Sequence, residues 1–199
     1  MKILAFSDLH RDLNQAEALT RMAEDADVVV GAGDFASAHQ GLEETIEALS
    51  GIETPAVLVP GNNETHEALS EAVASLWPAA YVLHGNEVEI DGRIFFGLGA
   101  GIPTTPWDWS FDLDETEAEA ALADLPEHAI LVVHSPPRNH CDTAGDGMHL
   151  GSTAVLAAIE RTDPRLVVCG HIHEAWGQTS KVGGTEIINL GPSGRLIEV

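Results

Sequence analysis

The segment Lys2-Ile3-Leu4-Ala5-Phe6-Ser7-Asp8-Leu9-His10 joins an apolar run directly to an aspartate and a histidine. The run is short and apolar, which predicts a buried strand over residues 2–7. Asp8 and His10 then stand at or just past the end of that strand. In open α/β sheets, ligands bind outside the carboxyl ends of the strands. This segment therefore indicates an α/β fold with a ligand site at its first strand end.

Four later segments repeat the arrangement, because each places metal-binding side chains just after a hydrophobic strand. They are Gly33-Asp34, Gly61-Asn62-Asn63-Glu64, Val133-His134 and Gly170-His171-Ile172-His173. Taken singly, such segments can also be a helix cap, a turn or a buried core histidine. Together, five strand ends can converge on one cleft. The mixture of imidazole and carboxylate favours Mn²⁺, Fe²⁺, Co²⁺, Ni²⁺ or Zn²⁺, whereas an all-oxygen set would favour Mg²⁺ or Ca²⁺.

The order of elements predicts two sheets. The first half alternates strands at 2–7, 27–31 and 56–59 with helices at 14–24, 42–49 and 64–76, which implies parallel strands with right-handed crossovers. Short strands follow at 81–83, 88–90 and 93–98, then an aromatic-rich loop at 104–113 and a helix at 114–125. A strand at 129–133, a loop at 135–151, a helix at 153–161 capped by Ser152 and a strand at 166–169 come next. Three short antiparallel strands are expected after residue 175. We therefore predict one domain, residues 1–199, built as a four-layer α/β/β/α sandwich with two mixed β-sheets.

The length and composition of the chain fit a single folded domain. The chain has 199 residues, 44% of them hydrophobic, which is enough for one core. No apolar run approaches the roughly 20 residues of a membrane helix. The apolar start is too short for a signal peptide, so we expect a cytoplasmic protein. Two cysteines, Cys141 and Cys169, do not make a disulfide framework, and we expect both thiols to be free.

The formal charge of −23 comes from 32 acidic and nine basic residues. The acids are spread along the chain rather than gathered in a tail. Such a charge keeps a protein hydrated at the cost of self-repulsion, so we infer a halophilic protein from a high-salt cytoplasm. The alternative is an ordinary acidic surface. In either case the charge argues against non-specific binding to nucleic acid or anionic membranes.

In their order, the five segments resemble the signature of the calcineurin-like metallophosphoesterases, over nearly the whole chain. The sequence is most similar to small single-domain prokaryotic members, which also carry turns like His134-Ser135-Pro136-Pro137 and Asn189-Leu190-Gly191-Pro192. The resemblance implies the metallo-dependent phosphatase fold. It also implies a cofactor of two divalent metal ions, with Mn²⁺ favoured and Fe, Ni, Co or Zn as alternatives.

The resemblance further implies a role for each ligand. Asp8, His10 and His173 would hold the first metal, and Asn62, His134 and His171 the second. Asp34 would bridge the two ions, because two cations about 3.5–4 Å apart need an anion between them. Asp34 and His10, together with Asn63, are the residues expected to act in catalysis.

Asn63 departs from the family pattern, in which a histidine follows the metal-binding asparagine. An amide cannot act as a general acid near neutral pH, and such an acid is worth about 10²–10⁴ in rate. The departure predicts a preference for leaving groups that depart easily. Possible substitutes or substrate-binding residues are His39, His66, His140, His149, Arg11, Arg138 and the aromatic cluster Trp107, Trp109 and Phe111.

These inferences predict a metal-dependent phosphoesterase, and a phosphodiesterase first, acting by attack of a metal-bridging hydroxide on a phosphate-ester substrate that could be nucleotide-like. Two alternatives stay open. One is a catalytically weakened metal-binding scaffold, and the other is a phosphomonoesterase or protein phosphatase. The physiological substrate and the oligomeric state are also open.

Overall fold

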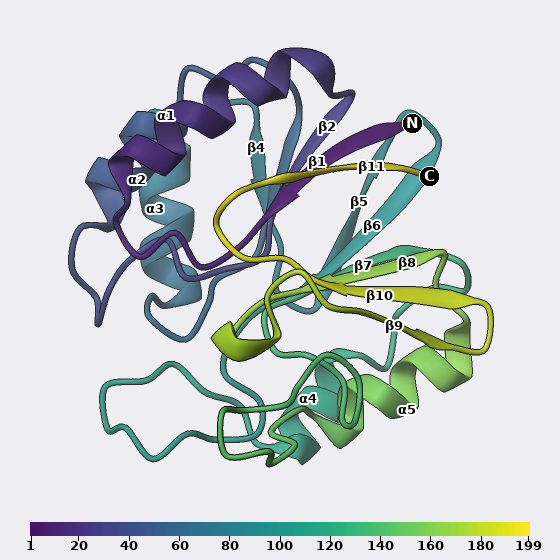
Figure 1. Ribbon diagram of the computed structural model, residues 1–199. Coiled ribbons are helices and arrows are strands. Elements are labelled where there is room, and N and C mark those ends of the chain that lie inside the picture. Colours follow the sequence, from purple (N-terminus) through teal and green to yellow (C-terminus); the bar gives the residue numbers. More distant parts are fainter.

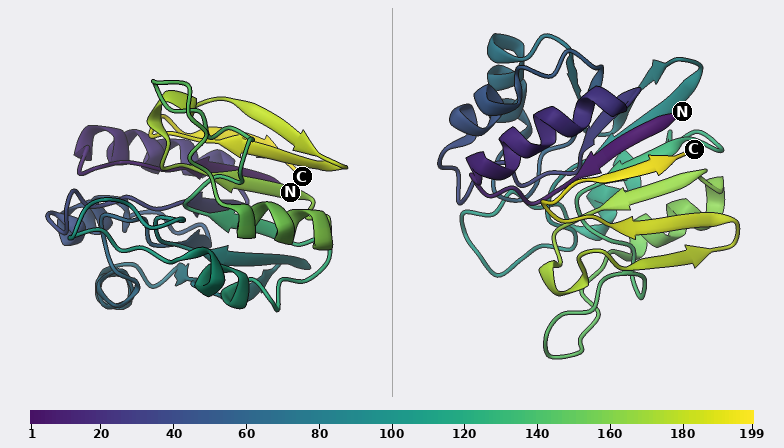
Figure 2. Two further views of the ribbon diagram at one scale, coloured as in Figure 1. Left: turned by 90° about the horizontal axis from the view of Figure 1, so that it is seen from below. Right: turned by 45° about the horizontal axis from the view of Figure 1, so that its top comes forward.

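The computed structural model describes residues 1–199 and contains two mixed β-sheets between two layers of helices (Figures 1 and 2). The first sheet has the strand order β11-β1-β2-β3-β4, formed by β1 (Lys2–Phe6), β2 (Val28–Gly31), β3 (Ala56–Leu58), β4 (Ala80–Val82) and β11 (Arg195–Glu198). The second has the order β5-β6-β7-β8-β10-β9, formed by β5 (Asn86–Ile90), β6 (Arg93–Leu98), β7 (Ile130–Val133), β8 (Leu166–Cys169), β9 (Thr179–Val182) and β10 (Thr185–Asn189). The helices are α1 (Leu13–Met22), α2 (Leu42–Leu49), α3 (His66–Leu76), α4 (Glu115–Ala121) and α5 (Thr153–Thr162), with 3₁₀ turns η1 (Ala23–Asp25) and η2 (His173–Ala175).

Three apolar clusters hold these layers together. On β1, Leu4 and Phe6 pack in the cluster shared with α1–α3, whereas Ile3 and Ala5 pack in the cluster shared with strands of the second sheet. The alternation follows from the two-residue period of a strand. A third cluster joins the outer face of the second sheet to α4 and α5. Both sheets are therefore covered on both faces, and the predicted α/β/β/α sandwich is confirmed.

Helix ends follow local chemistry. Ser152 caps α5 as predicted, since its hydroxyl accepts a hydrogen bond from the Val155 N–H at 3.1 Å. Helix α4 is shorter than the predicted 114–125. The carbonyl oxygens of Leu122 and Ala123, just past the end of α4, accept hydrogen bonds from the guanidinium of Arg161 on α5 at 2.6 and 3.3 Å. Pro126 also cannot continue a helix.

The prediction of three antiparallel strands at the end of the chain is wrong in its pairing. Strands β9 and β10 are antiparallel, but β10 pairs parallel to β8, and β11 crosses to the first sheet to pair antiparallel with β1. The turn before β11 contains Gly191 and Gly194 with φ of 85° and 73°, a conformation that favours glycine. This crossing brings the two ends of the chain side by side, with the Val199 N–H donating to the Met1 carbonyl oxygen (Figure 1).

The thiols, the helices and an edge strand bear on further expectations from the sequence. Cys141 and Cys169 are both free, as predicted, and both are buried. None of the helices has the length and apolar character needed to cross a membrane.

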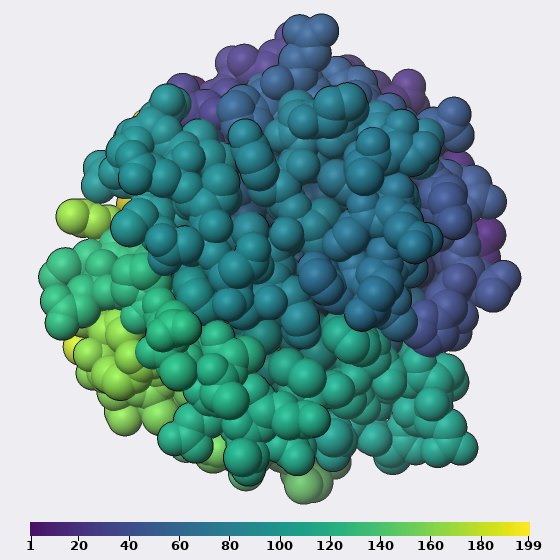
Figure 3. Space-filling view, turned by 180° about the vertical axis from the view of Figure 1, so that it is seen from behind, coloured from purple at the N-terminus to yellow at the C-terminus, as the bar shows by residue number.

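The middle of the chain covers most of the face turned away in Figure 1 (Figure 3). Edge strand β5 exposes Glu87 and Glu89, and such charges oppose pairing of this edge with another sheet.

Candidate metal centre

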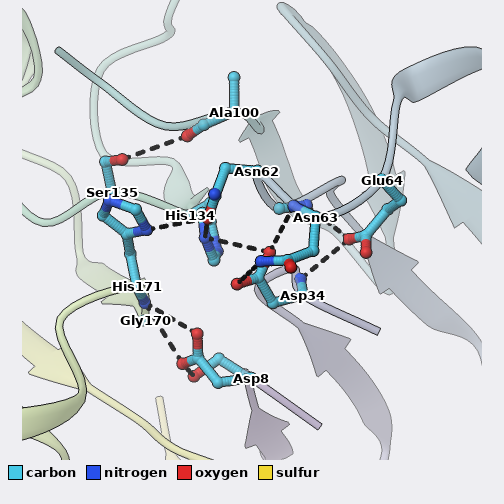
Figure 4. A network of polar contacts seen from close by, with 12 residues as sticks. Asp8, Asp34, Asn62, Asn63, Glu64, Ala100, His134, Ser135, Gly170 and His171 are labelled. Atoms are coloured by element: carbon cyan, nitrogen blue, oxygen red, sulfur yellow. Dashed lines mark hydrogen bonds and ion pairs between the residues drawn. The ribbon is translucent and has the colours of Figure 1, made fainter. Parts of the chain in front are cut away.

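The five ligand segments meet where the two sheets come together. Asp8, Asp34 and Asn62 follow β1, β2 and β3 of the first sheet. His134 follows β7, and the Gly170–His173 segment follows β8 of the second. The strands within each of these groups are parallel, so their carboxyl ends lie at one edge, and the two edges adjoin. All seven residues named as ligands therefore lie around one centre. Figure 4 shows Asp8, Asp34, Asn62, His134 and His171 among them.

The first group of ligands consists of Asp8, His10 and His173. Nε2 of His10 lies 3.1 Å from Nε2 of His173, and the latter atom lies 3.8 Å from Oδ1 of Asp8. The candidate ligand atoms of the three residues all lie within 4.8 Å of one another. Two imidazoles and a carboxylate facing one point are a suitable donor set for a borderline divalent ion.

The second group is centred on the side-chain oxygen of Asn62. Its Oδ1 lies 3.3 Å from Nε2 of His134 and 3.1 Å from Nδ1 of His171. Asp34 lies between the two groups. Its Oδ1 is 3.5 Å from Nε2 of His134, and its Oδ2 is 3.5 Å from Nε2 of His10. One carboxylate oxygen therefore faces each group, which is the arrangement that a bridging ligand requires.

The ligand side chains are oriented by further hydrogen bonds. Nδ1 of His134 lies 2.8 Å from the Ala32 carbonyl oxygen, and Nδ1 of His10 lies 3.2 Å from that of Ala36. A carbonyl oxygen that accepts a hydrogen bond from Nδ1–H keeps the proton on Nδ1 and so leaves the Nε2 lone pair free for a metal. Asn62 Nδ2 donates to Ser110 Oγ at 2.9 Å, which turns Oδ1 of the same amide toward the centre.

Trp176 is a supporting residue that the sequence did not reveal. Its Nε1–H donates to Oδ2 of Asp8 at 3.1 Å, and the His171 N–H donates to Oδ1 at 3.0 Å. Asp8 is thus anchored by the segment that also supplies His173. Trp176 lies three residues after His173, but a tryptophan at that spacing carries no recognised signal of metal binding.

The backbone at the centre is strained. Asp8, His10, Asp34 and His171 have φ of 55°, 46°, 58° and 67°, in the left-handed region that non-glycine residues rarely adopt. Each such residue costs about 1–2 kcal/mol. Gly33 (φ 91°) permits the close approach of the strand ends, since a Cβ there would lie 2.6 Å from both His134 Nδ1 and Gly61 Cα. Strain of this kind gathers at functional sites.

The buried carboxylates at the centre have no lysine or arginine partner in the protein to balance their charge. The carboxylates of Asp8, Asp34 and Glu64 are all buried, and no lysine or arginine forms an ion pair with any of them. Burial raises the pKa of Asp34, and the neighbouring charge of Asp8 adds to the rise. Buried carboxylates this close are costly unless positive charge balances them. Four imidazoles, two carboxylates and an amide oxygen fit two divalent ions.

Asn63 and Glu64 support Asp34 from behind (Figure 4). The Asn63 side chain donates from Nδ2 to Asp34 Oδ2 at 2.7 Å and accepts from the Ala38 N–H at 2.8 Å. The Glu64 carboxylate accepts backbone N–H groups from Asp34, Ala36 and Gly61 at 2.9, 2.9 and 2.6 Å. Burial raises the pKa of Glu64, with the charge of Asp34 as a second cause. The pair fixes the loop that carries the candidate bridging ligand.

A cleft of about 530 Å³ opens over the centre. His10, Asp34, Asn62, Asn63, His171 and His173 line its base. Its walls come from the segment Pro103–Trp109 and from Ala144, Leu150 and Glu174. Trp107 and Trp109 of the predicted aromatic loop thus lie at the cleft, whereas Phe111 does not line it.

The remaining candidates raised from the sequence lie outside the lining of this cleft. His66 stacks on His84, His140 contacts Ser180 Oγ, and His149 pairs with Asp142. His39 Nε2 contacts the Trp109 carbonyl oxygen but does not line the cleft. The Arg11 side chain lies against Gly41, and Arg138 is likewise absent from the lining. Neither arginine therefore lines the cleft in this structure.

Several known proteins are similar to this chain in sequence or in fold. Metallophosphoesterase domain-containing protein 1 of Homo sapiens is 35% identical over 126 residues, which are 60% of this chain and 37% of that protein. The chain thus spans well under half of the human protein's length. The crystal structure of the protein TT1561 from Thermus thermophilus has a TM-score of 0.79 at 21% identity, covering 96% of this chain and 90% of that one. An archaeal protein described as a novel phosphodiesterase has a TM-score of 0.58 at 19% identity, covering 96% and 84%.

A family model also matches nearly the whole chain. The calcineurin-like phosphoesterase superfamily domain matches residues 1–197, a range that includes all seven candidate ligands. Members of this family use dinuclear divalent metal sites and act on phosphate esters. This chain belongs to the calcineurin-like phosphoesterase superfamily.

Proposed function

We propose that this protein is a phosphodiesterase whose dinuclear metal site is formed by Asp8, His10, Asp34, Asn62, His134, His171 and His173. The observation that carries the proposal is the position of Asp34, whose two oxygens each lie 3.5 Å from an imidazole of a different ligand group. Two divalent ions held by these residues would lower the pKa of bound water, so that hydroxide is available near neutral pH, and would balance the negative charge of a phosphate.

The chain's own residues divide into two sets of ligands around Asp34. Asp8, His10 and His173 form one set, and Asn62, His134 and His171 form the other. Burial, followed by the neighbouring His134, lowers the pKa of His171, so this imidazole is neutral and can offer a lone pair. Mn²⁺ is the ion that we favour, with Fe, Ni, Co or Zn as alternatives, because the mixed donor set accepts each of them.

Two features support diesters over monoesters. Asn63 cannot protonate a leaving alkoxide, and its amide is already engaged with Asp34 and Ala38. The cleft is lined by no lysine or arginine, so only bound cations would balance a substrate's charge. A diester carries one negative charge at phosphorus, whereas a monoester can carry two. A singly charged substrate with a good leaving group therefore suits this cleft best.

A catalytically weakened metal-binding scaffold is the second candidate. The engagement of Asn63 with Asp34 favours it, because the histidines at the base of the cleft, His10, His171 and His173, are all candidate metal ligands and none replaces the missing one. Against it stands the presence of all seven candidate ligands around one centre, since a scaffold has no need of a pair of metals.

We also propose that residues 1–199 act as one domain in a salt-rich cytoplasm. The apolar cluster between the sheets joins strands from both halves of the chain. Only one ion pair, Arg21–Glu17, links an arginine or lysine to a carboxylate, although the chain has 32 acidic residues. Solvent cations must therefore balance most of the acidic surface.

Metal titration and turnover test the proposal together. After chelation and dialysis, the protein should bind two Mn²⁺ per chain by calorimetry and regain hydrolysis of bis-p-nitrophenyl phosphate as the ions are restored. Two bound ions without turnover of this or any other diester would favour the scaffold.

A further inference from the structure

Trp107 and Trp109 form an exposed aromatic pair at the cleft. Their ring centroids are 5.7 Å apart and their planes differ by 15°, so the rings are stacked. The two residues are 51% and 38% exposed, and both line the cleft above the metal centre. Leaving large aromatic surfaces in water is unfavourable, and such exposed patches commonly mark binding sites.

The pair is tied to the metal centre through the next two residues. Ser110 Oγ accepts a hydrogen bond from Nδ2 of Asn62 at 2.9 Å, and the Phe111 N–H donates to the Asn62 carbonyl oxygen at 2.9 Å. His39 holds the Trp109 carbonyl oxygen, with its ring edge-on to that indole. The indoles are therefore held at a fixed place relative to the candidate ligand Asn62.

The loop that follows β7 provides further apolar surface at the cleft. Ala144 and Leu150 line it, and Leu150 is 41% exposed. Asp142 braces this loop by accepting the N–H groups of Asn139 and Gly151 at 2.9 Å each. A volume of about 530 Å³ is the size of a small-molecule site.

Beyond the metals, the cleft offers apolar and aromatic surface together with the polar side chains of Thr104 and Thr105. The only charged side chains in the lining are Asp34 and Glu174, together with histidines, and no arginine or lysine contributes. An anionic extension of the substrate would be repelled by this acidic protein. A flat, uncharged aromatic group would instead find two stacked indoles beside the metal centre, and such a group stacks well on tryptophan.

We propose that Trp107 and Trp109 determine substrate specificity by stacking on a flat aromatic group, a nucleobase or an aryl ring, of a small phosphodiester whose phosphate lies at the metal centre. The place of the phosphate rests on the proposed function. The stacking rests on the tryptophan pair and can be tested without turnover.

Equilibrium binding tests the proposal most cleanly. Thymidine 5′-methyl phosphate and dimethyl phosphate carry the same singly charged diester with poor leaving groups, but only the first has a base. Calorimetry on the Mn²⁺-loaded protein in molar salt should give about tenfold or tighter binding of the thymidine diester, in line with the worth of one stacked base. Equal affinity for the two ligands would overturn the proposal.

Variants of Trp107 separate stacking from general packing. Trp107→Leu removes the aromatic face and should reduce the affinity ratio of the two ligands several-fold, whereas Trp107→Phe should keep most of it. The double change Trp107→Ala with Trp109→Ala should bring the ratio close to one. Tyr81→Ala removes an aromatic residue that is 48% exposed but lies outside the cleft, and should leave the ratio unchanged. A ratio that no tryptophan variant alters would contradict the proposal.

Failure of the proposed function would look different. If the wild-type protein hydrolysed no diester yet bound the thymidine ligand more tightly in a Trp107-dependent manner, the stacking surface would stand and the phosphodiesterase assignment would fall. If the wild-type protein hydrolysed diesters with no preference for a base or ring, the phosphodiesterase assignment would stand and the stacking proposal would fall.

Discussion

Asn63 donates two hydrogen bonds to Asp34, from its backbone N–H to Oδ1 at 2.9 Å and from Nδ2 to Oδ2 at 2.7 Å. The residue that replaces the family's usual histidine thus holds both oxygens of the candidate bridging ligand. Groups that orient metal ligands typically contribute about 10- to 100-fold to affinity or activity.

Removal of the Asn63 amide should therefore weaken the metal centre. Asn63→Ala is expected to lower Mn²⁺ affinity or diester turnover by about 10- to 100-fold, because one oxygen of Asp34 loses its partner. Calorimetry and kcat/KM measure the two effects. Asn14→Ala, a change at an exposed position of α1, is the matched control. If Asn63→Ala behaved like Asn14→Ala, Asn63 would have no positioning role.

The missing general acid should appear in the leaving-group dependence. In a series of methyl aryl phosphates, turnover should fall steeply as the leaving group becomes more basic. Asn63→His should rescue the poorest leaving groups by up to about 10², and p-nitrophenolate little, since general-acid help is worth about 10²–10⁴ in full. Alkyl and aryl esters hydrolysed equally fast by the wild-type protein, with chemistry rate-limiting, would rule out this interpretation of Asn63.

His84 should make stability depend on pH. It is partly buried, its Nδ1 accepts the Gly99 N–H at 3.2 Å, and its ring stacks on His66 with centroids 5.2 Å apart. Burial, with a smaller effect of His66, lowers the pKa of His84 from 6.5 to about 4. As the pH falls, His84 is therefore protonated near pH 6.5 in the unfolded chain but only near pH 4 in the folded chain. This linkage reduces stability as pH falls through that window.

The contribution of His84 can be isolated with His84→Asn, whose amide oxygen can still accept the Gly99 N–H. As the pH falls from about 7 to 4.5, the wild-type protein should lose about 1–2 kcal/mol more free energy of unfolding than the variant does. This range allows for solvent screening of the partly exposed His84. Urea titrations at matched metal concentration measure it, so that loss of metal affects both proteins alike. Parallel pH profiles for the two proteins would contradict the assignment.

Salt should stabilise the fold. With one Arg–Glu ion pair and a formal charge of −23, screening of acidic self-repulsion is the main effect expected. Raising KCl from about 0.1 to 2 M at fixed free Mn²⁺ should add about 1 kcal/mol or more, roughly 2–4 °C in Tm. Sucrose at matched osmolality should not reproduce this increase. Equal Tm at both salt concentrations would favour the ordinary acidic surface.

The sequence was sufficient for the features that depend on local pattern. The apolar run before Asp8 and the histidines after β8 predicted strand ends that converge, because parallel strands end at a common edge. Ser152 and the span of α2 were likewise readable from capping and periodicity.

Features that depend on distant pairing were not predictable. The partner of β11 is β1, at the other end of the chain, and no local signal encodes that choice. The engagement of the Asn63 amide with Asp34 could not be read from its neighbours in sequence, nor could the contact of Trp176 with Asp8. The stacking of Trp107 on Trp109 depends on the backbone path of a loop with no regular period.

In the proposed function, Asp34 would be a ligand to both divalent ions, and these ions would support phosphodiester hydrolysis. The most direct test is hydrolysis of bis-p-nitrophenyl phosphate in molar salt with and without Mn²⁺, by the wild-type protein, Asp34→Ala and the exposed control Asp124→Ala. We expect metal-dependent turnover by the wild-type and Asp124→Ala proteins and a loss of at least about 10²-fold in Asp34→Ala, since metal sites supply the nucleophile. Turnover that persists in Asp34→Ala, or that needs no divalent metal, would contradict the account.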